Sequence, residues 1–112
     1  EGKYLDQFFV NRDLPTAGSA TGLALSADPE QRFLYISDFP NSRVIVVERK
    51  SKRELYQFGE RNAEPGNFQG IHHIAVDAQG NLYTSEVAPG SRAQKFVFKG
   101  LSATLPANAL PQ

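Results

Sequence analysis

The residues best suited to chemistry are two adjacent histidines, His72 and His73, the only ones in the chain. Imidazole is the commonest metal ligand in proteins and acts as an acid or base near neutral pH. The apolar residues that follow the pair predict a strand over residues 72–77. Because neighbouring residues of a strand point to opposite faces, we expect the two imidazoles not to serve one metal ion together.

Other reactive side chains have simpler interpretations. Ser37 and Ser85 follow hydrophobic strand residues, and no Gly-x-Ser-x-Gly sequence marks either as a nucleophile. Asp77 and Glu86 are predicted to support the fold rather than to act as paired acid and base. The basic run at residues 49–53 is interpreted as a solvated turn, as short charge runs usually are.

Composition excludes several classes of protein. Twelve basic and twelve acidic side chains give no net charge, which argues against a chain that mainly neutralises phosphates or anchors to an anionic membrane. The absence of cysteine excludes disulfides and thiolate metal sites. No apolar run approaches the roughly 20 residues that span a bilayer. The 112 residues suffice for one small domain.

Short apolar runs separated by glycine, proline and asparagine predict an all-β chain. The expected strands are 4–10, 22–26, 33–38, 43–47, 54–59, 72–77, 81–86 and 92–98. No window has apolar residues at helical spacing over three turns. Residues 101–112 are expected to form a mobile or loosely docked tail.

The strand pattern occurs twice. Equivalent residues lie at a nearly constant spacing: Tyr35 and Tyr83 are 48 residues apart, Arg43 and Arg92 49 apart, and Phe8 and Phe58 50 apart. A period of about 40–50 residues with four strands in each is typical of β-propeller blades.

The second unit resembles the NHL family of propeller repeats. The residues that carry the resemblance are Phe58-Gly59, Pro65-Gly66-Asn67-Phe68, Ile74-Ala75-Val76-Asp77, Gly80-Asn81-Leu82-Tyr83 and Arg92. In the first unit the matching residues are Leu23-Ala24-Leu25, Tyr35-Ile36-Ser37-Asp38, Asn41 and Arg43-Val44. The chain departs from the family pattern in lacking a Pro-Gly-x-Phe element before Gly22, in having Glu86 where the family has aspartate, and in a longer loop at residues 87–91.

The resemblance implies NHL-type β-propeller blades over residues 1–100, about two per chain. Residues 4–10 would complete a blade, residues 22–59 form a whole blade, and residues 72–98 supply three strands of another. Closed propellers contain roughly 4–8 blades. The propeller is therefore incomplete unless the chain oligomerises or belongs to a longer one.

Three outcomes of this incompleteness stay open: a piece of a longer chain, a ring of identical copies, or pairing by strand exchange into another assembly. Because the sequence starts at Glu1 and has no methionine, we expect a processed, trimmed or excerpted product. If the chain is complete, we expect a homo-oligomeric ring, with a trimer favoured. Residues 4–10 of one copy would then pair with residues 92–98 of its neighbour.

Within the family, the segment is similar to peptidyl-hydroxyglycine amidating lyases. That resemblance implies that His72 occupies the position of a zinc ligand, while Thr21 holds the equivalent place in the first unit. A three-fold ring would bring three copies of His72 toward its axis, where zinc could bind with an open position. We prefer a histidine at the channel mouth or hydrogen-bonded in the core, since one ligand per chain is thin evidence for a site. No cofactor is therefore expected, and zinc is the alternative.

The preferred function is a binding or interaction scaffold that presents loops to a protein, peptide or carbohydrate. The alternative is a metal-dependent, lyase-like enzyme with a metal in the channel. Some NHL proteins bind RNA, but the neutral charge disfavours a nucleic acid partner here. No membrane partner is expected.

Overall fold

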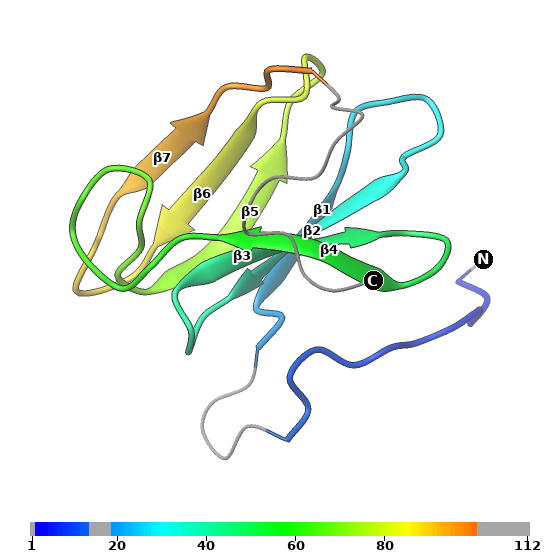
Figure 1. The fold of residues 1–112 in the computed structure, drawn as a ribbon, viewed down its shortest axis with the longest axis horizontal. Helices are drawn as coiled ribbons and strands as arrows, with labels where there is room; N and C mark the ends of the chain where they lie inside the picture. The colour runs from blue at the N-terminus through cyan, green and yellow to red at the C-terminus, as the bar shows by residue number, and fades with distance from the viewer. Residues whose placement is uncertain (1, 14–18, 101–112) are drawn as a thin grey trace.

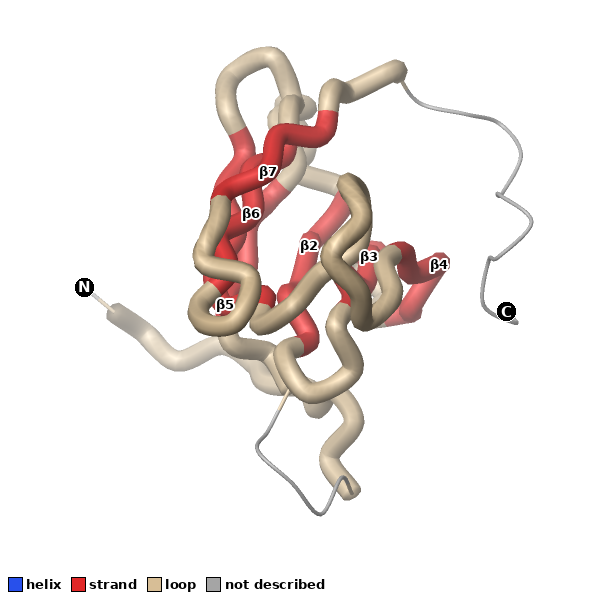
Figure 2. Tube along the Cα trace, turned by 90° about the vertical axis from the view of Figure 1, so that its left-hand side faces the viewer, coloured by secondary structure: helices blue, strands red, loops and turns tan. Residues whose placement is uncertain are grey.

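The computed structural model describes residues 2–13 and 19–100, and in these residues the secondary structure consists of strands (Figure 2). The strands are β1 (Gly22–Leu25), β2 (Phe33–Asp38), β3 (Arg43–Glu48), β4 (Arg53–Phe58), β5 (Ile71–Val76), β6 (Leu82–Glu86) and β7 (Ala93–Phe96). Each was predicted from the sequence with ends within two residues. Among the described residues there is no helix long and apolar enough to cross a membrane.

The strands form two antiparallel sheets (Figure 1). One has four strands in the order β1-β2-β3-β4, and the other has three in the order β5-β6-β7. Every strand therefore pairs with the one that precedes or follows it in the chain, as short turns require. The all-β prediction is confirmed.

A tight turn after Val76 shows how the sequence forms these hairpins. Asp77 accepts hydrogen bonds from the backbone N–H groups of Gln79 at 3.0 Å and Asn81 at 2.9 Å. Gly80 completes the turn with φ of 89°, a conformation that glycine adopts without strain. These contacts agree with the role in supporting the fold that the sequence predicts for Asp77.

The two sheets pack face to face, and β1 lies against β5 (Figure 1). Gly22 permits this approach, because a Cβ there would lie 3.1 Å from the carbonyl oxygen of His72. The core between the sheets is made by Val44, Phe68, Ile71, Ile74 and Leu82, with Ala24, Tyr35, Phe58, Val76 and Phe96 around them. The first strand of each sheet is therefore the point where the two sheets meet.

A second core lies on the other face of the four-stranded sheet. It contains Leu34, Ile36, Ile45 and Val47, and Phe8 and Val10 pack against it. In Figure 1 the N-terminal segment (blue) runs along this side of the sheet, away from β5–β7. The segment packs its apolar side chains onto this face, where Leu34, Ile36, Ile45 and Val47 are all buried.

Residues 4–10 form no strand, which corrects the sequence-based prediction. A β-strand needs a neighbour for its backbone N–H and C=O groups. Within the described residues no strand pairs with this segment. The segment at residues 4–10 therefore packs side chains on the four-stranded sheet without pairing as a strand. The predicted tail at 101–112 lies outside the described residues.

We expect Phe68→Ala to lower the free energy of unfolding by about 3–5 kcal/mol, because it empties a fully buried site between the sheets. The ring of Phe68 contacts those of Phe58 and Phe96, with centroids 6.5 and 5.9 Å away. Urea denaturation followed by circular dichroism measures the change. As a control, Phe98→Ala removes a ring that is 43% exposed and should cost much less. Equal losses in the two variants would contradict this core.

Candidate functional site

One end of the two sheets gathers most of the polar residues singled out in the sequence. Asp38 ends β2 and Glu86 ends β6, and an arginine stands at or just before the start of the next strand in each sheet. His72 lies near the start of β5, at the same end. The internal repeat thus places two buried carboxylates and the histidine pair close to the loops that join the sheets.

The Asp38 carboxylate is completely buried and holds four side chains. Arg43 donates from Nε at 2.7 Å, and Asn41 donates from Nδ2 at 3.0 and 3.2 Å. Asn11 donates from Nδ2 at 3.0 Å and Ser19 from Oγ at 2.7 Å. Asp38, Asn41 and Arg43 are thus joined across the β2–β3 turn, and the carboxylate also holds the loop that precedes β1.

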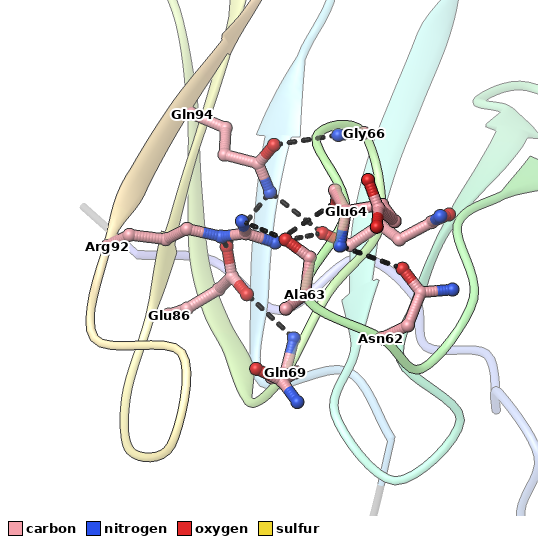
Figure 3. A network of polar contacts seen from close by, with 9 residues as sticks. Asn62, Ala63, Glu64, Gly66, Gln69, Glu86, Arg92 and Gln94 are labelled. Atoms are coloured by element: carbon pink, nitrogen blue, oxygen red, sulfur yellow. Dashed lines mark hydrogen bonds and ion pairs between the residues drawn. The ribbon is translucent and has the colours of Figure 1, made fainter.

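Glu86 holds the corresponding position in the three-stranded sheet (Figure 3). Its Oε2 accepts from Arg92 Nε at 2.7 Å and from Gln94 Nε2 at 2.9 Å, and its Oε1 accepts from the backbone N–H of Gln69 at 2.7 Å. The glutamate side chain, one methylene longer than aspartate, is completely buried. The longer side chain therefore still forms a carboxylate–arginine pair like that of Asp38 and Arg43.

Arg92 and Gln94 connect this carboxylate to the loop between β4 and β5. The guanidinium of Arg92 donates to the carbonyl oxygens of Ala63 and Asn67, each at 2.7 Å. Gln94 accepts from the backbone N–H of Gly66 at 2.8 Å (Figure 3). These contacts fix the loop that carries Phe68 into the core.

We call each group of a buried carboxylate, its arginine and the loop they hold a clasp: the Asp38 clasp and the Glu86 clasp. Around Glu86, burial raises the pKa of the carboxyl, but hydrogen bonds from Arg92, Gln69 and Gln94 outweigh it and leave the pKa below its ordinary value. A carboxylate held ionised by several donors supports the fold and is not poised to transfer protons. The structural role predicted for Glu86 agrees with this geometry.

The histidine pair lies differently from the prediction. Residues Ile71 and Ile74 are both buried, whereas His72 and His73 between them are both exposed. The register of β5 against β6 shifts between Ile71 and His73, so β5 has one residue more than its partner there. Such a β-bulge breaks the alternation of side chains. The expectation that the two imidazoles point to opposite faces is therefore wrong: their rings are nearly parallel, with centroids 5.9 Å apart.

The surroundings of His72 are aromatic and backbone groups. Its ring meets the ring of Phe39 edge to face, with centroids 6.2 Å apart. Since His72 is exposed, the interpretation as a core histidine does not apply. In the described ranges 2–13 and 19–100, no three or more histidine, cysteine or acidic side chains group as metal ligands. The chain thus carries an exposed imidazole pair at this end of the sheets.

Ser37 and Ser85 lie in different environments. Ser37 is completely buried, and its hydroxyl lies 3.3 Å from both the Gly22 and the His72 carbonyl oxygens. Thr21, the residue equivalent to His72 in the first unit, lies 3.0 Å from the same hydroxyl. Ser37 therefore joins β1 to β5 and is not accessible as a nucleophile. Ser85 is exposed on the outer face of the three-stranded sheet.

A groove of about 270 Å³ lies at the opposite end, between the β1–β2 and β5–β6 turns. Its lining residues are Ser26, Ala27, Asp28, Phe33, Tyr35, Ala78, Gln79, Gly80 and Phe98. A hydrogen bond from Ser26 lowers the pKa of the Asp28 carboxyl below its ordinary value, so the group is ionised at neutral pH. The groove combines aromatic rings with one negative charge.

The sequence alone did not predict the groove. It also did not identify several of the residues that donate hydrogen bonds to the two buried carboxylates. Asn11, Ser19, Gln69 and Gln94 carry no local motif, and three of them reach the carboxylates from loops 17–27 residues away. No protein-family model matches the chain, and no curated protein matches it. The geometry of the clasps, the histidine pair and the groove is therefore the basis for assigning a function.

We expect Glu86→Gln to lower the free energy of unfolding at neutral pH by about 2 kcal/mol, because charged hydrogen bonds become neutral ones. The lowered folded pKa of Glu86 means that its contribution is present above its unfolded pKa and is lost as pH falls through the folded value. The variant should therefore lose less stability than the wild type on acidification below about 4.5.

Denaturation measured from neutral to acid pH tests this expectation. The matched control is Glu60→Gln, since Glu60 is exposed on the neighbouring loop. A Glu86→Gln variant with the stability and pH dependence of the wild type would show that the clasp contributes nothing.

Proposed function

We propose that the two sheets are blades of an NHL-type β-propeller and that the chain is a binding and interaction scaffold, assembling as a homo-oligomeric ring. The observation that carries the proposal is the repeated clasp. Asp38 with Arg43 and Glu86 with Arg92 occupy equivalent places, at ion-pair distances of 2.7 Å in both. Two sheets of the same design packed face to face favour a repeat architecture that needs further sheets to close.

The fate of the reactive groups favours a scaffold over an enzyme. Asp38 and Glu86 are used by the clasps, and Ser37 is used between β1 and β5. Loops and turns at the two ends of the sheets remain for contact with other molecules, as is common where a rigid sheet positions variable loops.

The groove is the best candidate surface for a ligand. Its rings from Phe33, Tyr35 and Phe98 suit stacking against a sugar face or an apolar side chain, and Asp28 suits a hydroxyl or cationic group. This is the chemistry of a carbohydrate or peptide ligand. The scaffold therefore presents the turns of adjacent sheets as one binding surface.

We expect the chain to bind members of a glycan or peptide array, and Phe98→Ala to weaken that binding by about tenfold or more. The dissociation constant is then measured by titration calorimetry with the best array ligand. Val97→Ala is the control, because Val97 is exposed and adjacent but does not line the groove. Absence of any ligand, or equal weakening by both substitutions, would count against a ligand site in the groove.

A metal-dependent, lyase-like enzyme is the second candidate, favoured by the exposed pair of His72 and His73. Imidazoles of neighbouring copies would have to complete the coordination, since zinc sites in enzymes use three protein ligands.

We expect protein purified without a histidine tag to contain far less than one zinc ion per chain, and His72→Ala to leave that content unchanged. One ligand pair per chain does not make a tight site, because zinc needs three or four ligands. Elemental analysis by mass spectrometry measures the metal. If the wild type contained one zinc ion per chain and His72→Ala lost it, the scaffold proposal would be rejected in favour of the metal-dependent enzyme.

A further inference from the structure

The outer edge of β7 is free to pair with another strand. Among the described residues β7 has one neighbouring strand, β6. The N–H of Glu86 donates to the carbonyl of Arg92 at 2.8 Å, so Arg92 belongs to a hydrogen-bonded pair. Because such pairs alternate along an antiparallel ladder, the backbone groups of Ala93 and Lys95 point away from β6. An exposed edge of this kind is a template for strand addition.

The N-terminal segment repeats the sequence of a fourth strand. Leu5-Asp6-Gln7-Phe8 differs at one position from Leu55-Tyr56-Gln57-Phe58 in β4. In the four-stranded sheet, β4 pairs with β3, and its Phe58 packs into the core between the sheets. Within residues 2–13 and 19–100, no strand of the three-stranded sheet takes the place of β4. The described residues therefore hold a fourth-strand sequence without a ladder, and a third strand without its outer neighbour.

The segment already lies where the fourth strand of another sheet would lie. Phe58 packs against the three-stranded sheet from one side of the inter-sheet core. Phe8, at the equivalent position, packs with Val10 against the outer face of the four-stranded sheet. Asp6 is held on the same side by an ion pair with Lys52 at 3.4 Å.

We propose that the missing strands are β5–β7 of a second copy of this chain, whose β7 pairs antiparallel with residues 4–8 of the first copy. The inference rests on the proposed function and names the partner. The register follows from β3 and β4, in which Val44 lies opposite Phe58 and Val46 opposite Tyr56. The repeat spacing of 49 and 50 residues converts these pairs to Ala93 opposite Phe8 and Lys95 opposite Asp6.

This register joins opposite charges. In the proposed contact, Asp6 occupies the position of Tyr56 in β4, and Lys95 occupies the position of Val46 in β3. An apolar pair within one chain thus corresponds to a charged pair between two chains. Opposite charges directly across a ladder stabilise it, and like charges destabilise it. The carboxylate of Asp6 would lie between Lys95 of the second copy and Lys52 of its own chain. Charge complementarity therefore selects this edge.

The two outer faces that would meet between copies are equivalent, through the internal repeat, to the two faces that already pack together within one chain. Tyr35 lies between the sheets, and Tyr83, its equivalent, is exposed on the outer face of the three-stranded sheet. Leu82 lies between the sheets, and its equivalent Leu34 lies on the outer face of the four-stranded sheet. On that outer face Leu23 is 62% exposed. Joining the two outer faces reproduces the contact inside the chain. Repetition of this head-to-tail contact gives a ring if the rotation closes.

Charge reversal tests the pairing. We expect the full 112-residue chain to self-associate in light scattering coupled to size exclusion. Lys95→Glu and Asp6→Lys should each weaken association by about tenfold or more, and the double variant should recover it. Lys99→Glu, a reversal four residues beyond Lys95, is the control and should associate like the wild type. Circular dichroism and thermal melting establish that each variant is folded.

The results separate this inference from the proposed function. A monomeric wild type would overturn both the strand pairing and the proposed ring, whereas an oligomer that persists in Lys95→Glu would overturn the strand pairing alone. Neither result bears on ligand binding in the groove, which the glycan or peptide array measures separately. Loss of association in both single variants without recovery in the double variant would also overturn the register, because the charges would not lie opposite one another.

Discussion

The structure depends on the packing of two β-sheets against each other at the point where their first strands meet. Burial of apolar side chains between β1–β4 and β5–β7 supplies most of the core, and at about 25 cal/mol for each Å² removed from water it is the main stabilising contribution. Gly22 allows the two backbones to approach. Phe68, delivered by the loop after β4, fills the space where the sheets diverge.

The clasps explain how long loops stay on this core. A buried carboxylate without partners would cost several kcal/mol. Asp38 and Glu86 avoid that cost because arginine, amide, hydroxyl or backbone donors surround them. Each carboxylate then orders a segment remote in sequence. Because the same arrangement recurs in both sheets, it serves the architecture rather than a single reactive centre.

Among the described residues, β7 has an unpaired edge and both outer faces carry exposed apolar or aromatic side chains, and these features share one explanation. A sheet is stable when both faces and both edges are covered, paired or charged. Here the apolar outer face of the first sheet is covered in part by Phe8 and Val10. The edge of β7 is unpaired within the described residues. The proposed self-association would cover the edge and the faces with one contact, which is why we favour a second copy as the partner.

Local patterns in the sequence determined the strands, the hairpin turns and the internal repeat, because each depends on residues close together in the chain. The alternation of apolar and polar residues was sufficient to predict β6, and the glycine and asparagine before it were sufficient to predict the turn that joins it to β5. Tertiary structure decided the rest. The bulge at His72 depends on the register of β5 against β6, which a strand pattern does not fix. The strand predicted at residues 4–10 lacks a ladder because strand formation requires a neighbour as well as a suitable sequence.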